Sequence, residues 1–174
     1  MTVTLVLGGA RSGKSRHAES LARGKRHYIA TAEILDSEMA ERMSHHQSQR
    51  GEGWNTLEIP LELVEAIVRL DGKGHFILVD CITVWISNLM HAKRDVRAEV
   101  ARLGVSLKNL KADVVLVSNE VGQGIVPDNA LARAFRDEQG FANQRLAEAA
   151  DAVTFVTAGL PQVLKKPGHR RISK

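Results

Sequence analysis

An eight-residue segment near the N-terminus reads Gly8-Gly9-Ala10-Arg11-Ser12-Gly13-Lys14-Ser15. It matches the pattern G-x-x-x-x-G-K-[ST], and it lies between an apolar run at 3–7 and a helical pattern. Glycines let the backbone approach closely, so the N–H groups of such a loop can point at phosphate oxygens. The start of the following helix adds free N–H groups and the positive end of its dipole. The segment therefore predicts a phosphate-binding loop for a nucleoside triphosphate.

Three side chains near this loop have expected roles. Lys14 is expected to reach the β- and γ-phosphates, and Ser15 is expected to hold Mg²⁺. Asp80 ends a second apolar run, 75–80, at the position where phosphate-binding-loop proteins place an acid that organises Mg²⁺. The stretch Ser118-Asn119-Glu120-Val121 is not the N-K-x-D motif of small GTPases, and protein-kinase signatures are missing. The motif predicts nucleotide binding without naming the reaction.

Apolar runs alternate with helical patterns along the chain. Strands are expected at 3–7, 27–31, 75–80, 114–118 and 153–157, and the segment 54–59 is expected to be extended. Helices are expected at 14–22, 36–50, 60–70, 82–91, 96–110 and 128–150, the last with a break near Gly140. Uninterrupted apolar strands that alternate with helices are typical of a mostly parallel sheet covered by helices on both faces. We expect one α/β domain at 1–164 and a flexible basic tail at 165–174.

Composition narrows the possible classes of protein. The 174 residues include one cysteine, Cys81, so no intramolecular disulfide can form. No run of apolar residues is long enough to span a membrane, and the N-terminus does not resemble a secretion signal. A cytoplasmic protein is therefore expected. The net charge is +4, but the last ten residues supply five positive charges and the rest carries −1. With 4% aromatic residues as well, no nucleic-acid partner is expected.

A histidine in the expected helix 36–50 is a candidate nucleophile. His46 and Arg50 share a helical face, and Arg42 lies one turn before His46. Two neighbouring cations favour the neutral imidazole, which is the form that a nucleophile or base requires. On spacing alone, a solvated basic helix with an incidental histidine is the more common explanation, because runs of surface charge are common.

Several sequence blocks occur in an order typical of one family. They are the loop at 8–15 with Arg16, Y-I-A-T-A at 28–32, D-x-E-M-x-x-R-[IM]-x-x-H at 36–46, R-x-x-x-W-x-T-x-E at 50–58, L-V-D-C-I-T at 78–83, S-N-E-V-G-x-G-I-V-P-D-N-x-L-A-R-x-F-R-D at 118–137, and N-Q-R-L-A-x-A-A-D at 143–151. With these blocks the chain resembles the bifunctional adenosylcobinamide kinase / adenosylcobinamide-phosphate guanylyltransferase family, over about 3–164.

The resemblance implies a RecA-like P-loop fold, a homotrimer and two reactions. ATP or GTP phosphorylates adenosylcobinamide, and GTP then transfers GMP to that phosphate, giving adenosylcobinamide-GDP and pyrophosphate. The second step passes through a GMP–histidine intermediate, and the family pattern aligns with His46 rather than with the adjacent His45. Implied nucleotide contacts are Gly8, Gly9, Ala10, Arg11, Ser12, Gly13, Lys14, Ser15, Thr31, Ala32, Glu33, Gln47, Ser48, Gln49, Arg50, Glu58 and Asp80, with Ser15 and Asp80 serving Mg²⁺.

Two other functions remain compatible with the residues. A P-loop small-molecule kinase without nucleotidyl transfer would leave His46 a structural role. A nucleotide-binding regulator would use the same loop as a switch without catalysis. Labelled GTP distinguishes them, because the first transfers only the γ-phosphate and the second transfers nothing.

Overall fold

The computed structural model describes residues 1–32 and 53–168. The expected helix at 36–50 lies outside these residues, and so do the candidate site residues Glu33, His46, Gln47, Ser48, Gln49 and Arg50. Among the described residues, no helix combines the length and the apolar character needed to cross a membrane.

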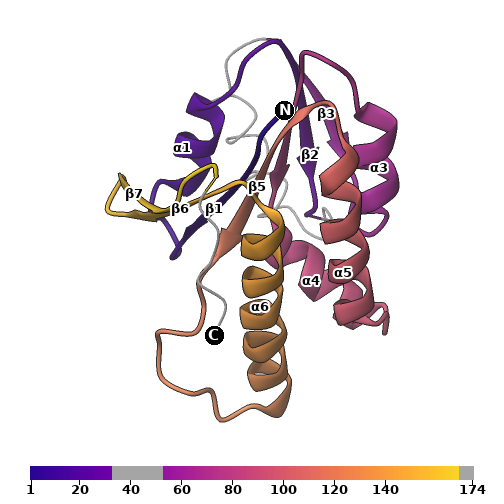
Figure 1. Ribbon diagram of the computed structural model, residues 1–174. Helices are drawn as coiled ribbons and strands as arrows, with labels where there is room; N and C mark the ends of the chain where they lie inside the picture. The colour runs from indigo at the N-terminus through magenta and orange to yellow at the C-terminus, as the bar shows by residue number, and fades with distance from the viewer. Residues whose placement is uncertain (33–52, 169–174) are drawn as a thin grey trace.

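Seven strands form one sheet in the described part of the chain, in the order β3-β2-β4-β5-β1-β6-β7 (Figure 1). Their bounds are Val3–Gly8 (β1), Lys25–Ala30 (β2), Trp54–Glu58 (β3), His75–Asp80 (β4), Asp113–Asn119 (β5), Ala152–Thr157 (β6) and Leu160–Lys165 (β7). Strands β1 to β6 pair in parallel, whereas β7 pairs antiparallel with β6. The mostly parallel sheet expected from the apolar runs is confirmed.

Helices cover both faces of this sheet (Figure 1). Their bounds are Lys14–Ser20 (α1), Leu63–Leu70 (α3), Ile82–His91 (α4), Val96–Ser106 (α5, followed by a 3₁₀ turn at Leu107–Asn109) and Ala130–Ala149 (α6). A larger core, which includes Leu5 and Trp85, lies on the side of α3 to α6. A smaller core with Val6 and Ala18 lies on the side of α1. Successive residues of β1 thus point to opposite faces of the sheet, and both faces are buried under helices.

The register of the sheet aligns the carboxyl ends of its strands at one edge. Gly8 at the end of β1 pairs with Asn119 at the end of β5. Asp80 at the end of β4 pairs with Val117 of β5 on one side and with Ala30 of β2 on the other. Strand β5 therefore separates the phosphate-binding loop from Asp80.

Two expectations about the C-terminal third were wrong. Helix α6 passes through Gly140 without a break, because a single glycine weakens a helix without ending it. Asn129 begins α6 by accepting hydrogen bonds from the N–H groups of Leu131 and Ala132, at 2.8 and 3.2 Å.

Strand β7 was missed, and it includes Lys165, so the sheet continues one residue into the segment expected to be a tail. Pro161 fits because β7 is an edge strand.

Candidate phosphate-binding site

The loop between β1 and α1 has the backbone shape that phosphate binding requires. Arg11 and Gly13 are left-handed, with φ of 54° and 91°. A Cβ atom on Gly8 would lie 2.5 Å from Ser12 Oγ and 2.7 Å from the carbonyl of Val156, so only glycine fits there. The N–H of Ser12 turns back to the carbonyl of Gly9 at 3.4 Å. The loop is therefore a tight turn that leaves little room for side chains at its start.

Cationic residues line a cavity beside this loop. Lys14 Nζ donates to the carbonyl of Gly9 at 3.2 Å, which holds the ammonium group over the loop. A cavity of about 660 Å³ lies alongside it, lined by Arg11, Ser12, Gly13, Lys14, Ser15, Arg16 and Glu19. Three of these seven residues are Lys or Arg and one is an acid. Residues 11–15 of the predicted loop thus line one electropositive cavity, which suits a polyphosphate.

Asp80 is oriented by a neighbour that sequence reasoning missed. The hydroxyl of Tyr28, on the adjacent strand β2, donates to Asp80 Oδ2 at 3.0 Å. Residue 28 belongs to a quoted sequence block, but nothing in the local pattern pairs it with residue 80. The contact can be inferred only after the strand order is known, because that order places the buried Tyr28 on the strand next to Asp80.

Thr31 is held beside Asp80 by a reciprocal contact. Its Oγ1 donates to the carbonyl of Cys81 at 2.7 Å and accepts from the N–H of Cys81 at 2.9 Å. Asn88 of α4 then donates to the carbonyls of Thr31 and Pro60, at 2.8 and 3.0 Å. The turn that follows β2 is thereby tied to the start of α4.

Glu58 and Ala32 lie farther from the loop within the fold. Glu58 ends β3, where it is exposed and pairs with Ala30. Strands β2, β4 and β5 lie between β3 and β1 in the sheet. Ala32 follows Thr31 directly, on the Asp80 side of the site. The carboxyl ends of the parallel strands therefore bring the loop, Asp80 and Glu58 to the same edge of the sheet, with Asp80 two strands and Glu58 four strands away from β1.

Cys81, beside Asp80, does not have the properties of a nucleophile. Burial raises the pKa of its thiol to about 11, and the negative charge of Asp80 adds to the rise. The neutral thiol is therefore the form present near neutral pH. Residues 1–32 and 53–168 contain no cluster of three or more His, Cys, Asp or Glu side chains suited to a metal. Ser15 and Asp80 with substrate phosphates remain a fitting donor set for Mg²⁺, because this ion is commonly held by one or two carboxylates plus phosphates.

A glycine loop on the first strand, a lysine over it and an acid two strands away define a P-loop nucleotide-binding protein of the α/β class. Residues 4–164 match the family described as cobinamide kinase / cobinamide phosphate guanyltransferase. The chain therefore belongs to this family. It is an enzyme of cobalamin biosynthesis with the two activities of the family, that of a cobinamide kinase and that of a cobinamide phosphate guanylyltransferase.

Two relatives are similar over nearly their whole length. The bifunctional adenosylcobalamin biosynthesis protein CobU of Salmonella typhimurium is 44% identical over 178 residues, covering 92% of this chain and 98% of that protein. The bifunctional adenosylcobalamin biosynthesis protein CobP of Pseudomonas aeruginosa is 43% identical over 166 residues, covering 92% and 96%. Among solved structures, the flagellar accessory protein FlaH of Methanocaldococcus jannaschii is similar in fold, with a TM-score of 0.52 at 13% identity, covering 95% of this chain and 79% of that one.

Proposed function

We propose that this chain phosphorylates adenosylcobinamide with ATP or GTP, and that it then transfers GMP from GTP to the product by way of His46. The observation that carries the proposal is the family match over 4–164 in a chain whose matching residues form a phosphate cradle. The products are adenosylcobinamide-GDP and pyrophosphate.

In the first step the chain's task is to position and neutralise. The loop amides and Lys14 bind the β- and γ-phosphates, and Arg11 and Arg16 add positive charge at the mouth of the cavity. Mg²⁺, when bound, neutralises charge on the phosphates, and Ser15 and Asp80 are the residues that would hold it. Tyr28 keeps the carboxylate of Asp80 in a fixed orientation. Of the other contacts proposed for the nucleotide, Thr31 and Ala32 follow β2 and Glu58 ends β3.

In the second step an imidazole nitrogen of His46 attacks the α-phosphorus of GTP. The bond from the α-phosphorus to the bridging oxygen breaks, and pyrophosphate leaves with the electron pair. A phosphate oxygen of the corrinoid then attacks the same phosphorus and releases the histidine. A direct reaction would require one anion to attack another. The covalent route replaces it with two steps, because the neutral imidazole is the nucleophile in the first and the leaving group in the second. Arg50 and residues 47–49 are proposed to contact this nucleotide.

The test uses GTP labelled at either the α- or the γ-phosphate. We expect the α-label to stay on the protein through a bond that is labile in acid and stable in base, because a phosphoramidate has these properties. His46→Ala should abolish this labelling and GMP transfer, while γ-phosphoryl transfer to the corrinoid persists. His45→Ala is the matched control and should label as the parent does.

Each other outcome of this test has a distinct meaning. Labelling in His46→Ala but not in His45→Ala would place the nucleophile one residue earlier. A parent chain that transfers the γ-phosphate and never carries α-label would favour a plain kinase. A chain that binds GTP and transfers neither label would favour a regulator.

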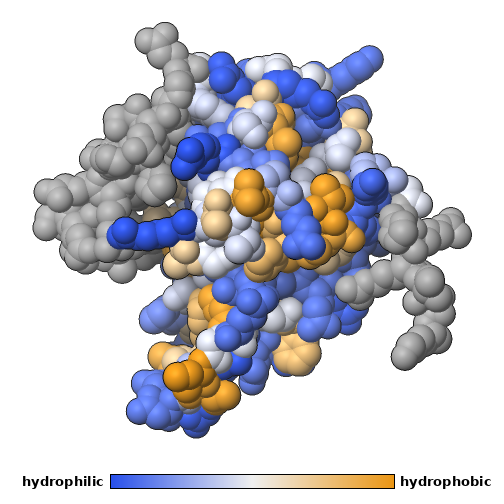
Figure 2. All heavy atoms as spheres, turned by 90° about the vertical axis from the view of Figure 1, so that its left-hand side faces the viewer, coloured by the Kyte–Doolittle hydropathy of each residue, from blue (hydrophilic) through white to orange (hydrophobic). Residues whose placement is uncertain are grey.

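We also propose that the protein acts in the cytoplasm and that it is a homotrimer, and the second of these proposals rests on the resemblance of the sequence to its family. The surface that carries β7 offers apolar side chains among hydrophilic ones (Figure 2). Leu160, Val163 and Leu164 of this edge strand are 73%, 55% and 55% exposed. Such a strand is suited to a contact between copies. Sedimentation equilibrium measures the number of subunits directly.

A further inference from the structure

Strand β5 ends between the two halves of the phosphate site. Its last residue, Asn119, pairs with Gly8, where the phosphate-binding loop begins. The N–H of the next residue, Glu120, donates to the carbonyl of Gly8 at 3.1 Å. Two positions before Asn119, Val117 pairs with Asp80. Any polar group at residue 119 therefore lies at the sheet edge between the loop and the proposed Mg²⁺ ligand.

Side chains from two helices fix the backbone of Asn119. Its N–H donates to Thr83 Oγ1 at 2.7 Å, in the first turn of α4. Its carbonyl accepts from Asn143 Nδ2 at 3.0 Å, from α6. These contacts use only main-chain atoms of residue 119, so they do not explain why its side chain is an amide.

A buried hydrogen-bond network holds Asn143 in turn. Ser118 Oγ donates to Asn143 Oδ1 at 2.7 Å, and Gln139 Nε2 donates to the same oxygen at 3.0 Å. Gln139 Nε2 also donates to Ser118 Oγ at 2.8 Å. All three side chains are buried, and a connected polar network of this kind is stiff. The main chain of Asn119 is thus preorganised.

The side chain of Asn119 has an unused acceptor. Its Oδ1 is buried and has no hydrogen-bond partner among the described residues. A buried acceptor that is left without a partner destabilises the folded chain. The hydroxyl oxygen of Ser12, in the phosphate-binding loop, is another buried polar atom without a partner there. Ser12 and Asn119 both lie next to Gly8. A Cβ atom on Gly8 would contact Ser12 Oγ, and Gly8 pairs with Asn119 in the sheet. Unpaired polar atoms therefore gather where substrate groups are expected.

We propose that Asn119 is a catalytic residue of the kinase step. Its Oδ1 accepts a hydrogen bond from the attacking hydroxyl of the phosphoryl acceptor and aligns that oxygen with the γ-phosphorus. The hydroxyl oxygen bonds to phosphorus, the bond to the β,γ-bridging oxygen breaks, and the electron pair leaves on the nucleoside diphosphate. The hydroxyl proton passes to an oxygen of the transferred phosphoryl group, since an amide orients a proton without taking it. The proposal rests on the kinase half of the proposed function.

The test compares Asn119→Ala with Asn55→Ala in the full chain. Asn55 is an asparagine on β3, whose side chain contacts His27 at 3.2 Å, away from the loop. Three quantities are measured: single-turnover transfer of the γ-phosphate to adenosylcobinamide, affinity for a non-hydrolysable ATP analogue, and α-labelling of the protein by GTP. We expect Asn119→Ala to slow γ-transfer by about 10²-fold, as loss of one transition-state hydrogen bond does. Analogue affinity and α-labelling should stay at the parent values, and Asn55→Ala should match the parent throughout.

Two more variants keep the test decisive if Asn119→Ala folds poorly. Asn119→Leu fills the same space without an acceptor and should lose the same factor in turnover. Asn119→Asp keeps an acceptor, so its turnover should fall less, while its added charge raises the KM for ATP.

Unchanged γ-transfer in the Ala and Leu variants, or analogue affinity that falls in step with the rate, would overturn this role. A parent chain without γ-transfer would instead contradict the kinase function itself.

Discussion

At the scale of single residues, the phosphate-binding loop could be predicted because its chemistry is local. Eight consecutive residues contain the glycines, the lysine and the serine in fixed spacing, and the structure brings Arg11 to Ser15 around one cavity. The position of Asp80 at the end of a strand could be predicted, because the end of an apolar run is visible in the sequence. Tyr28 and Asn119 could not be assigned roles, because their partners are 52 residues away and on a neighbouring strand, respectively.

The contact between Tyr28 and Asp80 leads to a prediction about Mg²⁺. Asp80→Asn keeps the size of the side chain and removes its charge, so turnover should require a much higher Mg²⁺ concentration. Tyr28→Phe removes a hydrogen bond to a charged group, a contact worth about 1.5–3 kcal/mol, so it should raise the requirement by roughly tenfold or more. Titration of both activities with Mg²⁺ measures the two shifts. An unchanged requirement in Asp80→Asn would move the metal role to another acid, and Glu58 would be tested next.

His27 leads to a prediction about pH. It is buried on β2, and burial lowers its pKa, with further lowering by the charges of His75 and Lys25. Its ring centroid lies 5.0 Å from that of His75. Protonation is therefore easier in the unfolded chain. The free energy of unfolding should fall as pH drops through the ordinary histidine pKa toward the lowered value, and His27 costs nothing above that range.

Denaturant unfolding of His27→Gln and of the parent chain measures this contribution. Between about pH 7.5 and about pH 5.5, the parent should lose more stability than the variant does. Part of the loss should remain in the variant, because burial also lowers the pKa of His17. Equal losses in both chains would show that His27 does not carry the effect.

At the scale of elements, the sequence predicted those whose boundaries are set by their own residues. Strand β4 and helix α4 begin and end where expected, because apolar runs stop there at Asp80 and at a basic turn. Strand β7 could not be seen, because Pro161 and Gln162 interrupt its apolar pattern and its pairing with β6 is a tertiary contact. The segment at 54–59, which was expected to be extended, forms the outer strand β3. Its pairing with β2 is likewise a tertiary contact that the local sequence does not show.

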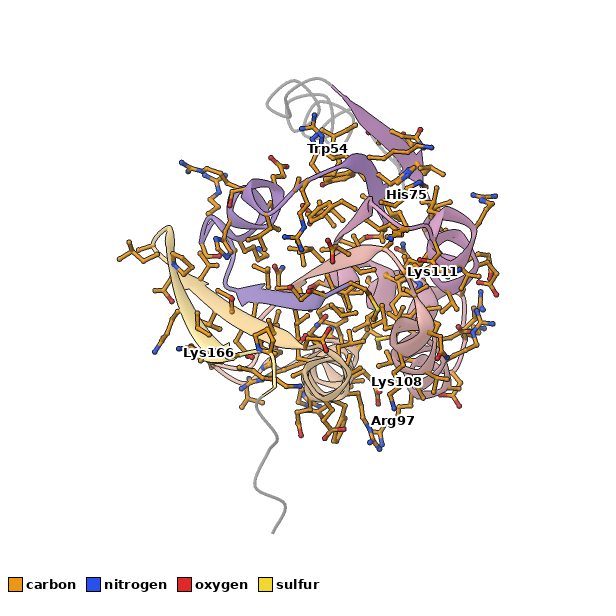
Figure 3. The ribbon with its side chains drawn as sticks, turned by 45° about the horizontal axis from the view of Figure 1, so that its top comes forward. Trp54, His75, Arg97, Lys108, Lys111 and Lys166 are labelled. Atoms are coloured by element: carbon orange, nitrogen blue, oxygen red, sulfur yellow. The ribbon has the colours of Figure 1, made fainter. Side chains whose placement is uncertain are left out.

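The end of β7 stabilises the end of α6 through one lysine. Lys165 Nζ donates to the carbonyls of Ala147 and Glu148, at 3.0 and 3.3 Å, and to that of Ala150. A cation at the C-terminus of a helix also interacts favourably with the helix dipole. Lys165→Met should therefore lower the free energy of unfolding by about 1–3 kcal/mol. Lys166→Met is the matched control, because Lys166 is exposed at the β7 side of the molecule, and it should change little (Figure 3). Similar thermal midpoints for the two variants would contradict the capping role.

At the scale of the whole molecule, the class of fold was predictable and the order of the strands was not. Alternating apolar runs and helices require a covered parallel sheet, but many strand orders satisfy that requirement. The order found here inserts β5 between the loop strand and the Asp80 strand. This insertion makes the end of β5 part of the site. Figure 3 shows the two ends of the strand order: Trp54 and His75 lie toward β3, and Lys166, which follows β7, lies at the other end.

The distribution of charge leads to a prediction about the C-terminal segment. Five of the positive charges lie in 165–174, and three of them, Arg170, Arg171 and Lys174, follow Lys166. We propose that the domain proper ends with β7. A chain that stops at Lys166 keeps every contact of Lys165 with α6, so its thermal midpoint, its subunit number and both transfer rates should equal those of the full chain.

A second truncation supplies the contrast. A chain that stops at Leu164 loses the lysine that contacts the end of α6, and it should lose about as much stability as Lys165→Met does. Calorimetry and sedimentation of the two truncated chains separate the contributions, because they differ by only two residues. If the chain ending at Lys166 dissociates or turns over more slowly, the basic residues after 166 contribute to assembly or to phosphate binding. If both truncations behave as the full chain does, Lys165 is not needed for the stability of α6.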